Sequence, residues 1–259
     1  MKEEFYIGWE ERAPAGYART VRWTVTGLLL LTALLGALLA GSQRQISRAI
    51  FEWGHPRRFE GVLRLDPVPH LTVFRMDGSP VTNRISAPLV APFKFGVNRA
   101  ELLPLEGRWV TLSATRVERD GQLMLELEPG SLQAAAPGTG PAPEAAGAAE
   151  KELSLGRQVF RGEIVDSKCW MGVMNPGALL PHRACAVRCL SGGIPPMLLI
   201  RRDGAPPLNL LLVSSAGQPV NAQVLPFVAE PVRVTGELVR QNGLLYLRIG
   251  PAAIERIGR

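Results

Sequence analysis

Three cysteines and one histidine lie close together in the second half of the chain. His182, Cys185 and Cys189 are three and four residues apart, so a helix that begins after Pro181 would carry all three on one face. Cys169 precedes them and could complete the same site from a loop. Three thiolates and one imidazole are the donor set of a closed tetrahedral zinc site, or of a soft-metal site for copper(I). The sequence therefore predicts these four residues as metal ligands, with zinc or copper as the cofactor.

The same residues allow two other chemistries. In an oxidising compartment Cys169 would form a disulfide with Cys185 or Cys189 and leave one free thiol. A thiol activated by His182 would instead make the chain a cysteine-dependent enzyme. The spacing is not one of the regular zinc patterns, but an odd number of cysteines suits a three-cysteine site. Asp166 could orient His182 beside a metal or lie in an exposed turn, and no catalytic residue is assigned.

The segment that carries these residues interrupts an internal repeat. Two stretches of the first half of the chain align with the second half at offsets of 101 and then 126, so the second copy has gained 25 residues between its first two strands. That insertion holds all three cysteines. A repeat of this kind governs the prediction of the fold. The aligned pairs are 59–66 with 160–167 (offset 101), 71–78 with 197–204 (offset 126) and 109–129 with 231–251 (offset 122).

Each copy has the pattern of a small β-barrel. Apolar and polar residues alternate over residues 231–241, and Asn242-Gly243 then forms a two-residue hairpin turn before a second alternating run. Asp120-Gly121 takes that place in the first copy. With two earlier strands that end near Asp-Gly and one short helix, the pattern favours a five-stranded barrel of the oligonucleotide/oligosaccharide-binding (OB) type. A simple antiparallel meander is the alternative, and either fold makes the protein mainly β.

An apolar stretch near the N-terminus predicts one transmembrane helix. Trp23 to Gly41 contains no charge over 19 residues, a length that just spans a hydrocarbon core of about 30 Å at about 1.5 Å per residue. A cleaved signal peptide is the main alternative, and it is disfavoured because Leu38 precedes Ala40 where a small residue is needed. Flanking arginines favour a cytoplasmic N-terminus only slightly. We expect a single-pass anchor in the lipid of a bacterial inner membrane, with the domains facing the periplasm or the exterior.

The predicted organisation follows from these elements. A linker rich in alanine, proline and glycine separates the two copies, because it holds no apolar residue large enough to anchor a core. The predicted parts are an N-terminal tail (1–21), a transmembrane helix (22–41), a first β repeat (50–132), a flexible linker (133–152) and a second β repeat (153–259) with its insertion at 168–193.

Charge and the remaining motifs narrow the choice of partner. A net charge of +6 admits nucleic acid, but aromatic residues are only 6% of the chain and are not interleaved with arginines, so we expect no nucleic-acid partner. His55 and His70 are expected to be surface or turn residues rather than ligands. Trp53, with Arg57 and Arg58, is expected to mark the membrane interface.

The second copy resembles uncharacterised, exported bacterial proteins with a small β-barrel. The resemblance rests on Gly162-Glu-Ile-Val-Asp-Ser-Lys-Cys169, on His182-x-x-Cys185-x-x-x-Cys189 and on Gly193-Ile-Pro195 before an apolar strand. It implies export, a β fold and a site at the cysteines and histidine, but no named activity. The leading hypothesis is a non-enzymatic, membrane-anchored accessory or assembly subunit of a membrane complex, which binds a protein partner through the insertion. The alternatives are a metal-binding or redox protein and a cysteine-dependent enzyme.

Overall fold

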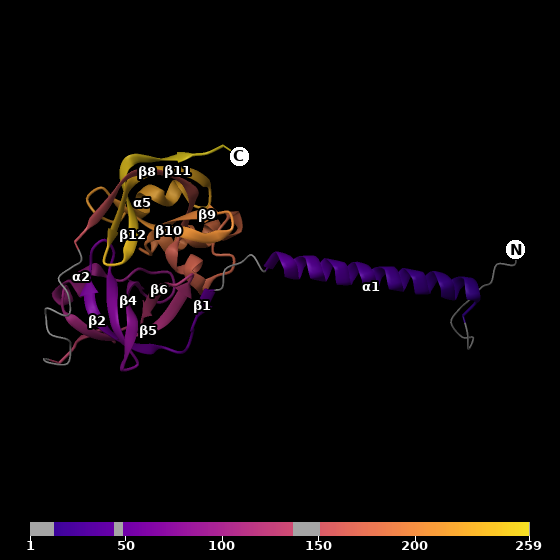
Figure 1. Cartoon of the computed structure of the whole chain (residues 1–259), viewed down its shortest axis with the longest axis horizontal. Coiled ribbons are helices and arrows are strands. Elements are labelled where there is room, and N and C mark those ends of the chain that lie inside the picture. Colours follow the sequence, from indigo (N-terminus) through magenta and orange to yellow (C-terminus); the bar gives the residue numbers. More distant parts are fainter. Residues whose placement is uncertain (1–12, 44–48, 137–150, 259) are drawn as a thin grey trace. The chain divides into compact units, whose positions relative to one another are not determined.

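The computed structural model describes residues 13–43, 49–136 and 151–258. Residues 49–258 within these ranges belong to one compact unit, and the N-terminal helix belongs to another. Figure 1 shows the helix as one continuous element and shows the strands of the second unit. The predicted N-terminal tail lies largely outside the described residues, as does most of the predicted linker.

The N-terminal helix α1 spans Ala15–Gln43. It is the one helix of the described chain that is long and apolar enough to cross a membrane. At about 1.5 Å per residue its 29 residues extend for about 43 Å, more than the 30 Å or so of a hydrocarbon core. The helix therefore begins before the predicted span of 22–41. It includes Arg19 and Arg22, because a helix can begin before its apolar segment begins.

The first repeat forms a closed five-stranded barrel with the strand order β5-β2-β3-β4-β6-β5. Strands β4 and β6 pair in parallel and the other neighbours pair antiparallel. Two short strands, β1 and β7, add to β5 outside this ring. The elements are β1 (Ala49–Phe51), β2 (Arg57–Arg64), β3 (His70–Met76), β4 (Ser79–Val90), α2 (Arg99–Leu102), η1 (Leu103–Leu105), β5 (Trp109–Arg119), β6 (Gln122–Leu127) and β7 (Gln133–Ala134).

The second repeat closes in the same way, with the order β10-β12-β11-β8-β9 and a parallel pair between β10 and β12. Its one long connection, residues 167–195, lies between β8 and β9. The elements are β8 (Leu153–Asp166), η2 (Cys169–Val173), η3 (Leu180–His182), α4 (Arg183–Ser191), β9 (Pro196–Arg202), β10 (Ala205–Ser214), α5 (Asn221–Val224), η4 (Leu225–Phe227), β11 (Pro231–Gln241) and β12 (Leu244–Arg256).

The structure confirms a mainly β protein with two tandem barrels, while the OB type stays a prediction. Both copies place a short helix between the third and fourth strands, and both close the last hairpin with a turn of positive φ. Asp120 and Gly121 have φ of 51° and 77°, and Asn242 and Gly243 have 51° and 75°. This conformation suits a two-residue hairpin turn and favours Asn-Gly and Asp-Gly. Asp77-Gly78 also forms a tight turn, between β3 and β4.

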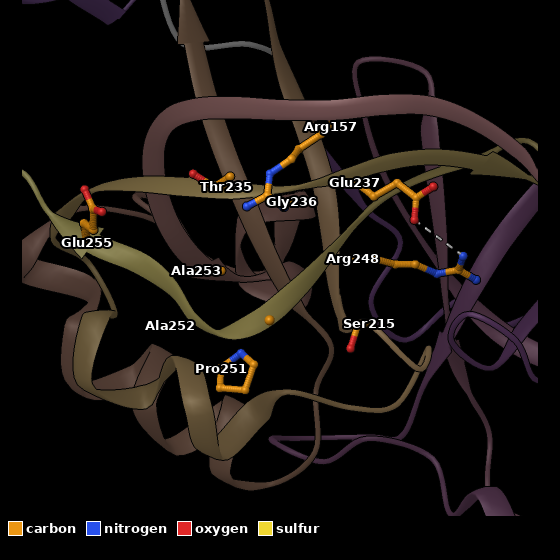
Figure 2. A pocket seen from close by; sticks show the side chains of 11 residues that line it. Arg157, Ser215, Thr235, Gly236, Glu237, Arg248, Pro251, Ala252, Ala253 and Glu255 are labelled. Atoms are coloured by element: carbon orange, nitrogen blue, oxygen red, sulfur yellow. Dashed lines mark ion pairs between the residues drawn. The ribbon is translucent and has the colours of Figure 1, made fainter.

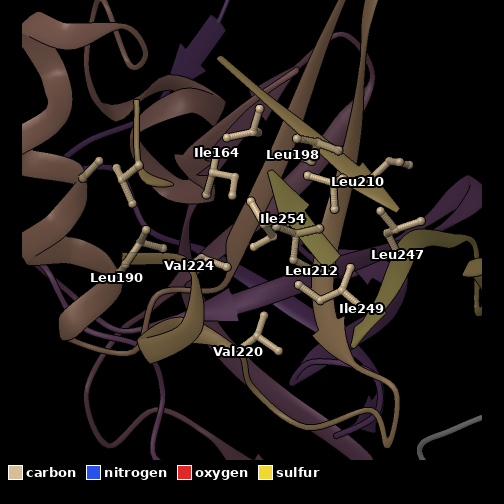
Figure 3. Close-up of a cluster of buried hydrophobic side chains, with 14 of the residues drawn as sticks. Ile164, Leu190, Leu198, Leu210, Leu212, Val220, Val224, Leu247, Ile249 and Ile254 are labelled. Atoms are coloured by element: carbon tan, nitrogen blue, oxygen red, sulfur yellow. The ribbon is translucent and has the colours of Figure 1, made fainter. Parts of the chain in front are cut away.

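Each barrel has its own apolar core, and a further apolar layer joins them. The core of the second barrel gathers side chains from its strands and from α4 and α5, including Ile164, Leu190 and Leu212 (Figure 3). A separate buried cluster combines Val90, Val117 and Met124 of the first barrel with residues of the insertion. The two barrels therefore pack together, with the insertion between them.

Candidate metal centre

The insertion brings the three cysteines together in space. Cys169 lies in η2, directly after β8, while Cys185 and Cys189 are one turn apart on α4. The three sulfur atoms all lie within 4.8 Å of one another, and the Sγ atoms of Cys169 and Cys185 are 4.0 Å apart. All three are free thiols. Cys169 and Cys189 are buried and Cys185 is half-buried. We refer to these three residues as the thiol cluster.

The spacing of the thiol cluster fits a bound metal ion. Zinc-to-sulfur bonds are about 2.3 Å long, so sulfurs that share one ion lie about 3.8 Å apart in tetrahedral and about 4.0 Å apart in trigonal geometry. The distance of 4.0 Å between Cys169 and Cys185 matches these values. A disulfide needs an S–S distance of about 2.05 Å, so forming one would require these side chains to move.

His182 lies beside the thiol cluster in a different group. It ends the η3 turn and precedes α4, which begins at Arg183, so the predicted helix carries Cys185 and Cys189 but not His182. Its Nε2 is 3.0 Å from Oδ2 of Asp166, and the other oxygen of that carboxylate accepts a hydrogen bond of 2.8 Å from the backbone N–H of Cys169. Asp166, Cys169 and His182 thus form a second possible ligand group that shares Cys169 with the first. The predicted four-residue set is divided between two overlapping groups.

Asp166 is fully buried, so it does not lie in an exposed turn. Its carboxylate fixes both the ring of His182 and the backbone at Cys169. The sequence suggested that it could orient His182, and the structure places it in contact with that ring.

Two lysines connect the first barrel to the insertion. The segment between β4 and α2, residues 91–97, lies against the insertion and is called the covering loop here. Lys94 of this loop places its Nζ 2.8 Å from the sulfur of Cys185 and 3.9 Å from that of Cys189. Lys168 of the insertion reaches in the opposite direction and donates to the carbonyl oxygens of Ala91 and Phe93, at 3.0 and 2.8 Å. The first barrel therefore supplies a cation at the thiol cluster.

Lys168 also forms an ion pair with Glu126 of the first barrel, with an Nζ–Oε2 distance of 2.5 Å. Both side chains are almost entirely shielded from solvent. Because removal of one member of a buried ion pair leaves an uncompensated charge, this pair ties the two barrels together.

The surroundings of the thiol cluster favour a negative charge on the sulfur of Cys189. The pKa of Cys169 is raised because its thiol donates a hydrogen bond to Cys189, and because burial and the carboxylate of Asp166 disfavour its thiolate. The pKa of Cys189 is lowered mainly because it accepts that bond, and the ammonium of Lys94 lowers it further. The pKa of Lys94 is raised, chiefly by its hydrogen bond to Cys185. Thiolates are the metal-binding form of cysteine, so Cys189 is the member of the cluster that its surroundings prepare for a metal ion, whereas Cys169 would release its proton on binding.

Sequence reasoning missed Lys94, Lys168 and Glu126. Lys94 is 91 residues from Cys185, and no spacing rule relates residues so far apart. Lys168 is adjacent to Cys169, but only the packing of the barrels shows that its ammonium contacts the covering loop and Glu126.

The prediction for His70 as a surface or turn residue is wrong. Its side chain is fully buried at the start of β3, with Nδ1 2.8 Å from the carbonyl oxygen of Val68. Burial lowers the pKa of His70 to about 4, because the charged ring would lose its hydration. His55 is exposed, as expected.

A pocket lies on the second barrel, where the β11–β12 ladder shifts between Val234 and Gly236. It has a volume of about 660 Å³ and is lined by side chains of both charges, including Arg157, Glu237 and Arg248 (Figure 2). Arg248 is already paired with Glu152 and lies 3.9 Å from Glu237. The described residues that line this pocket include no cysteine or histidine.

Comparison of the chain with protein-family models, with curated proteins and with solved structures finds no match. The resemblance of the second repeat to exported small-barrel proteins therefore stays a prediction that rests on its motif.

Proposed function

We propose that this protein is a membrane-anchored metal-binding protein that holds one thiophilic ion, zinc or copper(I), on Cys169, Cys185 and Cys189. The observation that carries the proposal is the convergence of three sulfurs from two separate elements within 4.8 Å of one another. Soft thiolate ligands select copper(I) or zinc, and a preformed, buried site lowers the cost of ordering the ligands.

The covering loop supports this assignment. Three thiolates carry three negative charges, which an ion of charge +1 or +2 does not fully neutralise. Lys94 supplies one further positive charge 2.8 Å from Cys185. His182 and Asp166 would then support the site from behind through the backbone and side chain near Cys169, as partners of ligands commonly do.

The geometry favours metal binding over a cysteine-dependent enzyme. Cys169 and His182 lie in one group with Asp166, which is the arrangement that a thiol nucleophile would use. A reactive cysteine needs a lowered pKa and access to substrate, whereas Cys169 is buried and its pKa is raised. We therefore propose a non-enzymatic role.

The hypothesis of an accessory subunit with a protein partner remains compatible with a metal site. The cysteine-bearing parts of the insertion pack against the first barrel, which favours a metal-bearing role for the insertion over direct contact with a partner. We propose that α1 anchors the chain in the bacterial inner membrane with the barrels in the periplasm, in line with the slight excess of arginines on the N-terminal side of its apolar stretch, residues 23–41.

Metal analysis of the full chain, purified in detergent, tests the proposal. We expect about one zinc or copper ion per chain, loss of that ion in Cys185→Ser, and retention of it in the control His55→Gln, whose ring is exposed. A free-thiol count on the denatured, metal-free protein should give three. A protein that carries no metal and has one free thiol would instead contain a disulfide, and the metal-binding proposal would then be abandoned.

A further inference from the structure

A cavity of about 200 Å³ lies between the two barrels. The first barrel lines it with β4 and β6, and the second lines it with η2, β9, β10 and β12. The last hairpin turn of each barrel contributes, because residues 121–123 and 243–245 both line the cavity and are equivalent by the repeat offset of 122. The cavity is therefore a product of the packing of the two copies, and interfaces between domains are a common place for small-molecule sites.

Most of the lining is apolar and shielded from solvent. Its apolar side chains include Met124, Met171, Met197 and Leu211, each at least 95% buried. An engineered apolar cavity of about 150 Å³ binds benzene. A volume of about 200 Å³ therefore suits an apolar body of that size with one small substituent.

A chain of hydrogen bonds fixes which polar groups the cavity offers. The indole N–H of Trp170 can only donate, and Oδ1 of Asn209 accepts from it at 3.0 Å. Nδ2 of Asn209 is then the donor in the 2.8 Å bond to Oε1 of Gln122. This order leaves the Nε2 of Gln122 as a donor that has no partner among the described residues. Asn209 and Gln122 both line the cavity.

Arg84 brings a positive charge to the same wall. It comes from β4 and Gln122 comes from β6, and these two strands pair in parallel. The guanidinium of Arg84 stacks on Phe74, 4.5 Å from the centroid of its ring. The described residues that line the cavity include no aspartate, glutamate or histidine, so no anion there opposes this charge. A guanidinium pairs with a carboxylate through two parallel N–H···O bonds, and an apolar wall disfavours a strongly hydrated inorganic anion.

We propose that this cavity binds a small apolar carboxylate, a molecule of about the size of benzoate. Its apolar body would lie against the buried methionines and leucines, and its carboxylate would accept hydrogen bonds from Arg84 and Gln122. This site goes beyond the proposed metal binding and does not depend on it, because the described residues that line the cavity include neither the thiol cluster nor His182.

Titration of the full chain with benzoate tests the proposal. The protein is held in lipid nanodiscs, so that no detergent enters the cavity, and NMR follows isotopically labelled methionine methyl groups. We expect benzoate to shift the signals of Met124, Met171 and Met197 in a saturable manner. The signal of Met174, which is exposed and does not line the cavity, should not move. Benzamide, the neutral counterpart, should bind about tenfold more weakly, because hydrogen bonds between charged partners are stronger.

The charge of Arg84 is tested separately. Arg84→Gln should weaken the binding of benzoate about tenfold and leave that of benzamide unchanged. Arg75→Gln is the matched control, because Arg75 lies on the neighbouring strand β3 and does not line the cavity, and it should bind benzoate as the unmodified protein does.

Three results would each overturn the site: no saturable shift at the three methionines, equal binding of benzoate and benzamide, or unchanged binding of benzoate in Arg84→Gln. The comparison of benzoate with benzamide uses the unmodified protein, so it decides the question even if Arg84→Gln fails to fold. Metal analysis of the same samples reports on the thiol cluster independently, so either proposal can fail while the other stands.

Discussion

Gly192 sets how closely the covering loop approaches the thiol cluster. Its backbone, at the end of α4, has φ −81° and ψ 0°, a conformation that alanine adopts without strain. A Cβ at this position would lie 1.9 Å from the carbonyl oxygen of Lys94, whereas ordinary contacts begin near 3.4 Å. The substitution Gly192→Ala therefore requires the loop to move by about 1.5 Å, the difference between these distances.

That displacement would also break a hydrogen bond of 3.0 Å between the N–H of Gly96 and the carbonyl oxygen of Gly192. Overpacking costs about 1–3 kcal/mol and a lost hydrogen bond about 1 kcal/mol. We expect Gly192→Ala to reduce the free energy of unfolding by about 2–4 kcal/mol in total. Because Lys94 lies on the same loop, its contact with Cys185 should weaken as well.

Chemical denaturation of the full chain measures this cost. Gly250→Ala is the matched control, because a Cβ there would meet nothing within 4 Å and its φ is not in the left-handed region. Hydrogen exchange should become faster at the covering loop in Gly192→Ala alone. If Gly192→Ala and Gly250→Ala are equally stable, the loop does not depend on contact with this glycine, and the argument for a tightly fitted cover is refuted.

Two further predictions concern titrating groups. Lys94→Gln should raise the pKa of Cys189 in the metal-free protein, because it removes a nearby positive charge. The pH at which the absorbance of the thiolate appears should therefore be higher in this variant. No change in that pH, or an equal change in the exposed control Lys151→Gln, would contradict the prediction. The pKa of His70 is lowered from 6.5 to about 4 in the folded chain. As the pH falls, this histidine is therefore protonated in the unfolded chain before it is protonated in the folded one. About 3 kcal/mol of the free energy of unfolding is lost between pH 6.5 and pH 4. In His70→Gln this part of the pH dependence should disappear, whereas in His55→Gln it should remain; parallel stability curves for His70→Gln and the unmodified chain would show that burial of the ring is not the cause.

The repeat and its strand register follow from local patterns, which is why the sequence predicts them. In the structure Phe59 pairs with Leu112, and Phe160 pairs with Val234. These pairs are related by the same offsets, 101 and 122, that align the two copies in the sequence. Alternation and Asn-Gly or Asp-Gly turns act over a few residues, so they can be read without knowledge of the tertiary structure.

The position of two of the cysteines on one helix was predictable for the same reason. A spacing of three and four residues places side chains on one helical face, and α4 carries Cys185 and Cys189 as this rule requires. The ring of His182 was harder to place, because its partner Asp166 lies at the end of a strand and is buried only when the insertion folds back on that strand. No local pattern reports such a contact.

The asymmetry between the repeats acquires a physical explanation from the contacts between them. Only the second copy carries the cysteines, yet the first copy supplies Lys94 to the thiols and Glu126 to the buried Lys168. The first barrel packs against the part of the insertion that carries the cysteines and brings a positive charge to their sulfurs, so the candidate site draws on both copies although its cysteines belong to one.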